Sequence, residues 1–277
     1  MELILAKSAG FCFGVKRGVD IADKFLTENK TVYSLGHMIH NKCVIEKFEE
    51  KGMIVEEDID NIPDNSDVII RAHGVPLEVY NKLKAKNINI IDTTCINVQK
   101  IHDLVLEYSN LGYTIIIIGK REHPEVVGIQ GWVNGESYII ESIDEVDKLK
   151  RIKGVAVVSQ TTFNKDKSQA ICDKVQEICE EVVIHNTICS ATSVRQEEAK
   201  KIAKEVDAMI VIGDKKSSNS NRLYEISKEI CKNSIFIEKN DELDLKFFEK
   251  FNKIGVTAGA STPKDIIDEV CDTIASL

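Results

Sequence analysis

Three cysteines of this 277-residue chain lie in the same kind of local pattern. Cys12, Cys95 and Cys189 each follow a short apolar run with strand character and open a predicted helix. A glycine that ends the next predicted strand lies 24 residues after each of them, at Gly36, Gly119 and Gly213. A helix N-terminus favours the thiolate form of a cysteine, and thiolates bind metals. The pattern therefore predicts that the three cysteines share one metal site.

The number of cysteines favours one kind of metal site over another. A structural zinc normally takes four protein ligands, whereas three cysteines suit a 4Fe-4S cluster in which one iron lacks a protein ligand and can act as a Lewis acid. Spacing alone does not distinguish iron from zinc, so a zinc hydrolase of a phosphorylated small molecule and a diphosphate-binding redox sensor remain alternatives. The other five cysteines have apolar neighbours and are predicted to be core residues: Cys43, Cys172, Cys179, Cys231 and Cys271.

A second set of residues consists of neutral hydrogen-bonding side chains at predicted strand ends. Such side chains, together with backbone N–H groups at helix starts, can surround the oxygens of a phosphate. The set predicts a site for a compact polyanion, and its members are His40, Asn41, His73, His123, Thr161, Thr162, Ser217, Ser218, Asn219, Ser220, Asn221, Ser261 and Thr262. Glu125 lies two residues after His123. An enclosed carboxyl group has its neutral form favoured, so Glu125 is the candidate proton donor; a favourable helix-start charge is the structural alternative.

The elements that position these residues are strand-like runs alternating with amphipathic helical segments, which is typical of α/β units with parallel sheets. The repeated cysteine pattern predicts three related α/β sub-domains with small, mainly parallel sheets. We expect them to span residues 13–95, 96–188 and 189–277, with the strand in residues 1–12 added to the third. In such sheets ligands bind beyond the carboxyl ends of the strands, where all the candidate residues lie.

Composition excludes several classes of protein. Hydrophobic residues make up 43% and charged residues 29% of the chain, which argues against disorder, and a net charge of -9 argues against a general nucleic-acid binder. The longest aliphatic run, residues 115–118, is too short for a membrane helix, and the first residues lack the features of a signal peptide. We therefore expect a cytoplasmic protein with neither a membrane nor a nucleic acid as partner.

Several longer motifs, in order along the whole chain, resemble one family. They are GFCFGV at 10–15, LGH at 35–37 with HN at 40–41, RAHGV at 71–75, EHPEVVG at 122–128, SQTT at 159–162, TIC at 187–189, SSNSNRL at 217–223 and GVTAGAS at 255–261. In these motifs the chain resembles the LytB/IspH family of isoprenoid biosynthesis, the 4-hydroxy-3-methylbut-2-enyl diphosphate reductases.

The resemblance implies a fold, an activity and a role for each candidate residue. It implies three α/β domains around a 4Fe-4S cluster bound by Cys12, Cys95 and Cys189, and a reaction that removes the hydroxyl of an allylic diphosphate to give isopentenyl and dimethylallyl diphosphate. Glu125 would relay protons with Thr161 in its hydrogen-bond network, and His123 would act beside them. The resemblance further implies that the diphosphate is held by His40, His73, His123, Ser217, Ser218, Asn219 and Ser261.

Two further expectations concern electron supply and departures from the family. The chain has no glycine-rich dinucleotide fingerprint, so electrons are expected from a separate protein of the ferredoxin or flavodoxin type. The family commonly has proline after the second cysteine and aspartate at the start of the third cysteine motif, where this chain has Ile96 and Asn186. We expect Ile96 to leave the ligand in place and Asn186 to alter hydrogen bonding near Cys189.

Overall fold

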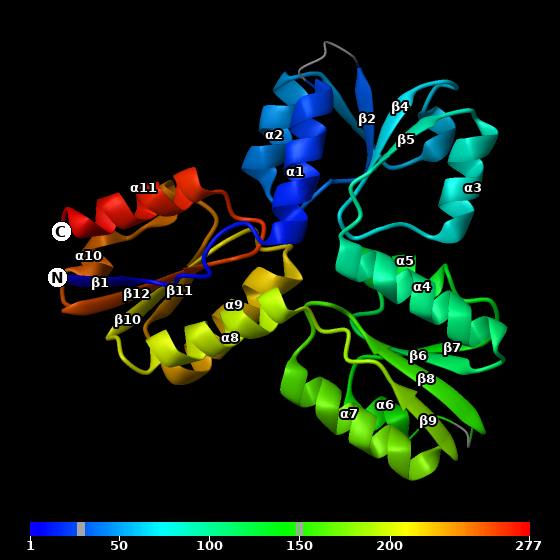
Figure 1. The fold of residues 1–277 in the computed structure, drawn as a ribbon. Coiled ribbons are helices and arrows are strands. Elements are labelled where there is room, and N and C mark those ends of the chain that lie inside the picture. The colour runs from blue at the N-terminus through cyan, green and yellow to red at the C-terminus, as the bar shows by residue number, and fades with distance from the viewer. Residues whose placement is uncertain (27–30, 148, 150–151) are drawn as a thin grey trace. The chain divides into compact units, whose positions relative to one another are not determined.

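The structure is a computed structural model that describes residues 1–26, 31–147, 149 and 152–277. Within these residues the strands form three sheets of four, and every pairing between neighbouring strands is parallel (Figure 1). Helices connect the strands, as parallel pairing requires. The predicted α/β class with three small parallel sheets is confirmed.

The three sheets have the same strand order when each is followed from the strand that precedes a cysteine. The first sheet runs β1 (Glu2–Leu5), β12 (Lys253–Ala258), β10 (Ala208–Ile212), β11 (Ser234–Ile237). The second runs β5 (Asn89–Asp92), β4 (Asp67–Ile70), β2 (Val32–Leu35), β3 (Met53–Glu56). The third runs β9 (Glu181–Ile184), β8 (Gly154–Ser159), β6 (Thr114–Ile118), β7 (Ser137–Ile140). The cysteine strand is therefore an edge strand in all three.

Helices and short helical turns occupy the connections between strands. The α-helices are α1 (Phe13–Leu26), α2 (Lys42–Glu50), α3 (Leu77–Ala85), α4 (Ile96–Asn110), α5 (Pro124–Gln130), α6 (Ile143–Val146), α7 (Lys165–Ile178), α8 (Ser190–Ala203), α9 (Ser218–Ile230), α10 (Leu245–Phe248) and α11 (Lys264–Ala275). Two 3-10 turns, η1 (Ile59–Asn61) and η2 (Asn240–Glu242), complete the described elements. Each cysteine of the predicted metal site directly precedes a long helix: α1, α4 or α8.

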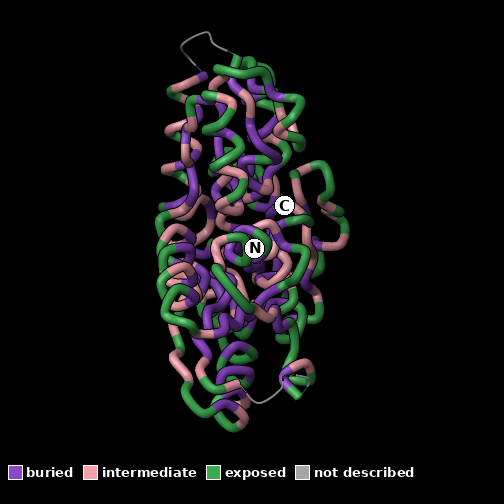
Figure 2. Tube along the Cα trace, turned by 90° about the vertical axis from the view of Figure 1, so that its right-hand side faces the viewer, coloured by how far each residue is buried: buried purple, intermediate pink, exposed green. Residues whose placement is uncertain are grey.

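The all-isoleucine run of β6 shows why these sheets form. Ile116 and Ile118 pack with α7 on one face of the sheet, whereas Ile115 and Ile117 pack with α4 and α5 on the other. All four side chains are fully buried. Alternate residues of a strand point to opposite faces, so a strand covered by helices on both faces is apolar at every position. Figure 2 colours the described residues by how far each is buried.

The described chain forms two compact units. One comprises residues 1–16, 40–46 and 190–277 and contains the first sheet; the other comprises residues 17–39 and 47–189 and contains the second and third sheets. In the first unit β1 pairs with β12 in the register Glu2 to Lys253. The expected boundaries at residues 13–95, 96–188 and 189–277 stay a prediction.

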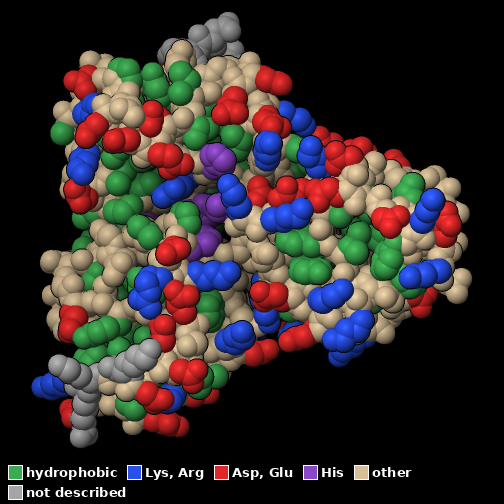
Figure 3. All heavy atoms as spheres, turned by 180° about the vertical axis from the view of Figure 1, so that it is seen from behind, with side chains coloured by type: hydrophobic (Ala, Val, Ile, Leu, Met, Phe, Trp, Pro, Cys, Tyr) green, Lys and Arg blue, Asp and Glu red, His purple; other side chains and the backbone are tan. Residues whose placement is uncertain are grey.

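The surface carries both signs of charge. Acidic and basic side chains are interspersed over the face shown in Figure 3, rather than separated into large fields of one sign. None of the described helices is long and apolar enough to cross a membrane.

Candidate active site

The three cysteines have the same backbone environment. The N–H of Cys12 donates to the carbonyl of Ala260 at 3.1 Å, that of Cys95 to Ala72 at 3.0 Å, and that of Cys189 to Thr161 at 3.0 Å. Each acceptor lies two residues beyond the end of the strand next to the cysteine strand: β12, β4 or β8. The equal spacing in the sequence thus corresponds to one local structure that occurs three times.

The cysteine sulfurs are suited to act as thiolate ligands. None of the three cysteines takes part in a disulfide among the described residues, and all three are partly exposed. Each is followed by the first residue of a helix, where the helix dipole favours a negative charge. Two of the sulfurs accept hydrogen bonds: Cys12 Sγ from the N–H of Val15 at 3.5 Å, and Cys189 Sγ from Nδ2 of Asn97 at 3.2 Å. Donors directed at a sulfur are typical around metal-bound thiolates. This donor set fits an iron-sulfur group.

The remaining cysteines follow the prediction that they are core residues. Cys172, Cys179 and Cys231 are buried, and Cys43 and Cys271 are partly buried against the apolar core of the first unit. Burial raises the pKa of the Cys271 thiol to about 11, with the charges of Asp268 and Asp272 adding to the effect. Such a thiol is a poor metal ligand at neutral pH.

Glu125 has a buried carboxyl group that accepts two hydrogen bonds from Thr161. It lies in the first turn of α5 and is 2% exposed. Thr161 donates to it twice, from its backbone N–H at 2.6 Å and from its hydroxyl at 2.8 Å. Burial raises the pKa of Glu125 to about 7, while the two hydrogen bonds from Thr161 oppose the rise. A carboxyl group with this pKa can both release and take up a proton near neutral pH.

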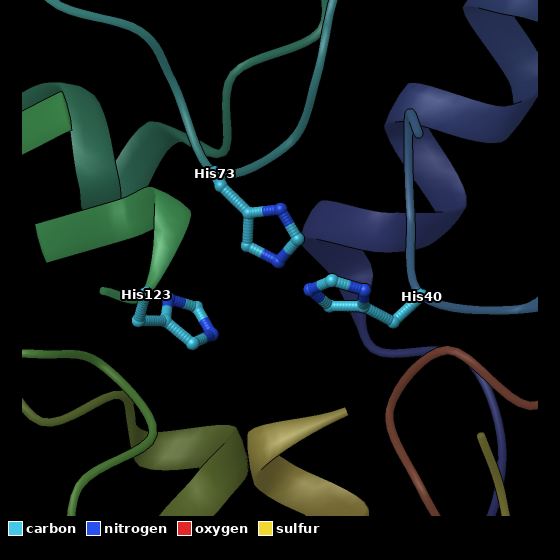
Figure 4. A group of neighbouring side chains, drawn as sticks. All are labelled: His40, His73 and His123. Carbon is cyan, nitrogen blue, oxygen red and sulfur yellow. The ribbon is translucent and has the colours of Figure 1, made fainter. Parts of the chain in front are cut away.

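His123 lies two residues before Glu125, and the ring of His73 contacts that of His123 (Figure 4). His123 precedes α5, and its Nδ1 accepts a hydrogen bond from the N–H of Glu125 at 3.1 Å. Because Nδ1 is occupied as an acceptor, the other ring nitrogen, Nε2, is the one that can carry a proton toward a ligand. His73 follows β4, and its ring meets that of His123 edge to face at a centroid distance of 5.3 Å.

Together, these contacts connect all the candidate residues of the second unit. Cys95 is bonded to the residue before His73, His73 touches His123, and His123 is bonded to Glu125. Glu125 is bonded to Thr161, and Thr161 in turn to Cys189. The structure therefore brings together the candidate proton donor, two histidines and two of the predicted cysteine ligands.

The first unit gathers the other candidates at the carboxyl ends of β10 and β12. Ser217 directly precedes α9 and accepts a hydrogen bond from the N–H of Ser220, so it is the N-cap of that helix. Ser218 and Asn219 follow in its first turn. Ser261, after β12, donates to the carbonyl of His40 at 2.8 Å and is adjacent to the acceptor of the Cys12 N–H.

Asn219 is unusual among these residues because its side chain is almost fully buried, at 4% exposure. Within the described part of the chain, neither its amide nitrogen nor its amide oxygen has a hydrogen-bond partner. Leaving buried polar atoms unpaired costs about 1–3 kcal/mol each. A polar ligand would remove that cost.

The three positions that lie four residues beyond a strand-end glycine are equivalent only in part. His123 and Ser217 cap the helices that follow them, whereas His40 does not. In the corresponding loop the cap is Asn41, whose Oδ1 accepts the N–H of Val44 at 3.1 Å. Asn41, rather than His40, therefore caps α2.

Sequence reasoning missed two polar residues that shape the site. Asn97 bonds the Cys189 sulfur, and its only signal in the sequence was its place two residues after Cys95. Gln160 is 1% exposed and accepts the N–H of Lys120 at 3.1 Å, which fixes the loop before His123. Asn186, expected to alter bonding near Cys189, is exposed, and the side-chain bond to that sulfur comes from Asn97 instead. Ile96 is 47% exposed, directly after Cys95.

Comparison with known proteins adds family information to this geometry. The profile of a family described as LytB protein matches residues 3–275. The 4-hydroxy-3-methylbut-2-enyl diphosphate reductase of Clostridioides difficile is 45% identical over 100% of both chains. A solved structure of (E)-4-hydroxy-3-methyl-but-2-enyl diphosphate reductase, described as the terminal enzyme of the non-mevalonate pathway, is 38% identical, covers 100% of both chains and superposes with a TM-score of 0.73. The corresponding reductase structure from Plasmodium falciparum is 31% identical, covers 98% of this chain and 87% of that one, and has a TM-score of 0.93.

Proposed function

The chain belongs to the LytB protein family, and from this premise we propose that it is a 4-hydroxy-3-methylbut-2-enyl diphosphate reductase. The reaction takes an allylic alcohol diphosphate, two electrons and two protons. It breaks the carbon–oxygen bond of the hydroxyl, releases water and forms isopentenyl or dimethylallyl diphosphate. Identity of 38% or more over the full chain to reductases of that name supports the assignment.

A 4Fe-4S cluster held by Cys12, Cys95 and Cys189 would supply electrons and a Lewis-acidic iron to this reaction. The chain has three cysteines in equivalent positions rather than four, so one iron of such a cluster would lack a protein ligand. Hydrogen bonds to two of the sulfurs support a site made for thiolates. The electrons would come from a separate small protein of the ferredoxin or flavodoxin class, in the cytoplasm.

Proton transfer is assigned to Glu125. Removal of the hydroxyl as water needs a group that is protonated near neutral pH and screened from solvent, and Glu125 has a pKa of about 7 and is buried. Thr161 orients the carboxyl group through its two hydrogen bonds, and His123 is fixed beside it by the N–H of Glu125. This buried carboxyl group, bonded to the residue that also binds Cys189, is the observation that carries the proposed mechanism.

The diphosphate would be bound by neutral hydrogen-bond donors. The proposed set is His40, His73, His123, Ser217, Ser218, Asn219 and Ser261. Neutral donors can hydrogen-bond the oxygens of a diphosphate, as can backbone N–H groups at a helix N-terminus. Ser217 and Ser218 are in addition at the N-terminus of α9, where backbone N–H groups add to the binding.

Anaerobic purification with assays of iron, sulfide and zinc tests the proposal. We expect about four iron and four sulfide per chain, a brown protein, and reduction of the allylic alcohol diphosphate with a chemical electron donor. Cys172→Ser serves as a control for Cys189→Ser, because Cys172 is a buried core residue. Loss of the cluster in Cys189→Ser but not in Cys172→Ser is expected. A colourless zinc protein that hydrolyses phosphate esters would overturn the assignment.

A further inference from the structure

The amide side chain of Asn97 makes a contact that crosses a large part of the sequence. Asn97 is the second residue of α4, two positions after Cys95, and its Nδ2 donates a hydrogen bond to Sγ of Cys189 at 3.2 Å. The two residues are 92 positions apart in the chain. A polar side chain in the first turn of a helix commonly bonds the backbone of its own helix. Here it is directed at the sulfur of another predicted ligand.

The residue that makes this contact differs in type from the residues at the equivalent positions of the other two cysteine loops. The residues two positions after Cys12 and Cys189 are Gly14 and Ala191, which have no side-chain donor. The Cys12 sulfur accepts only a longer bond at 3.5 Å, from the backbone N–H of Val15. Among the sulfurs with a described hydrogen bond, that of Cys189 therefore receives the shorter one, and it alone receives it from a side chain. Substitution of Asn97 can remove this bond without changing a ligand.

We propose that Asn97 is a positioning residue that raises the reduction potential of the cluster through its N–H···S bond to Cys189. This inference rests on the proposed function. Addition of an electron makes a thiolate-bound cluster more negative, and a hydrogen-bond donor to the sulfur stabilises the more negative state. The donor therefore makes reduction easier. The size of the shift depends on how much stronger the bond is in the reduced state, and a difference of about 1.4 kcal/mol changes the equilibrium between the two oxidation states tenfold.

Two variants separate this role from a purely structural one. Asn97→Leu removes the donor at similar volume, and Asn97→Asp replaces the donor by an acceptor of nearly the same shape, with a negative charge facing the sulfur. Asn110→Leu is the matched control, since Asn110 lies at the far end of the same helix and its Oδ1 accepts a bond from Asn134. The two ends of α4 are about 20 Å apart at 1.5 Å per residue.

The measurement is the midpoint potential of the purified holoprotein, followed by electron paramagnetic resonance during a reductive titration, with iron content determined for each sample. We expect a potential about 59 mV lower in Asn97→Leu, which corresponds to a tenfold change for one electron. Asn97→Asp should be lower again, and the control should equal the wild type. Turnover with excess strong reductant should fall less than turnover with a weak one.

Each other outcome has a definite meaning. A wild-type protein without iron would overturn the proposed function itself. A cluster present in both variants at the wild-type potential would overturn the role of Asn97 and leave the function standing. Loss of the cluster from both variants, with the control intact, would also overturn it, because Asn97 would then be needed for assembly rather than for the potential.

Discussion

Thr161 donates two hydrogen bonds to the carboxyl group of Glu125, one from its backbone N–H to Oε1 and one from its hydroxyl to Oε2. The carbonyl of the same residue accepts the N–H of Cys189. One residue therefore fixes both the candidate proton donor and a predicted cluster ligand. The two bonds favour the charged carboxylate and burial favours the neutral acid, and the balance leaves the pKa of Glu125 at about 7.

Glu125→Gln should abolish most of the turnover and leave substrate binding intact. The amide has nearly the shape of the carboxyl group but cannot donate a proton to the leaving hydroxyl, so we expect turnover to fall by about 100-fold or more. The dissociation constant of the diphosphate substrate, measured by calorimetry, should not change. Glu122→Gln is the control, since Glu122 is an exposed residue of the same loop. Equal turnover in wild type and Glu125→Gln would contradict the assignment of the acid.

Thr161→Val should shift the pH dependence of the reaction. The acid must be protonated to act, so turnover of the wild type should fall as the pH rises through about 7. Removal of the hydroxyl deletes a bond that stabilises the carboxylate, which raises the pKa of Glu125 further. The alkaline limb of the pH profile should therefore move to higher pH, by about one unit for a bond to a charged group.

The neighbouring hydroxyl provides the control for that shift. Thr162 bonds the side chain of Gln160 rather than Glu125, so Thr162→Val should leave the position of the limb where it is in the wild type. A limb that moves to lower pH in Thr161→Val, or that moves equally in both variants, would be inconsistent with Thr161 as the partner of the acid.

The sequence predicts those features of the site that depend on residues adjacent in the chain. It does not predict those that depend on contacts between distant segments. The shared backbone setting of the three cysteines could be predicted because strand, cysteine and helix are contiguous, while their role as metal ligands stays a prediction. The strand at residues 115–118 could be predicted because a strand covered on both faces is apolar throughout. Glu125 could be predicted from its loop, but its pKa could not, since that depends on Thr161 in a different strand-end loop. The bond from Asn97 to Cys189 joins distant segments and has no counterpart in the other two cysteine loops, so the repeat did not reveal it.

Gly74→Ala should destabilise the protein more than another substitution with the same backbone penalty. Gly74 and Gly112 both have positive φ, +73° and +87°, so a side chain at either costs about 1–2 kcal/mol. A Cβ at Gly74 would lie 2.5 Å from Cε1 of His102, whereas a Cβ at Gly112 would meet nothing within 4 Å.

His102 cannot yield easily to that Cβ, because its ring is stacked on Trp132 at a centroid distance of 5.0 Å. We expect the unfolding free energy of Gly74→Ala, measured in urea, to be lower than that of Gly112→Ala by about 1–3 kcal/mol. Because His73 is the adjacent residue, affinity for the diphosphate should also fall in Gly74→Ala alone. Equal losses of stability in the two variants would show that His102 does not limit the space at Gly74.

Asn219→Ala should weaken binding of the diphosphate without lowering stability, whereas Asn221→Ala should lower stability and change binding less. The buried amide of Asn219 has no hydrogen-bond partner among the residues described, so its removal should not lower stability, but a ligand that satisfies it loses a charged hydrogen bond. We expect the dissociation constant of the diphosphate to rise about tenfold. Asn221 donates to the carbonyls of Lys215 and Ser217 at 2.6 and 2.9 Å, so its removal should cost about 1 kcal/mol of unfolding free energy and change binding less. Calorimetry and urea unfolding measure both quantities, and an Asn219→Ala variant that is destabilised yet binds normally would mean that this amide serves the fold rather than the ligand.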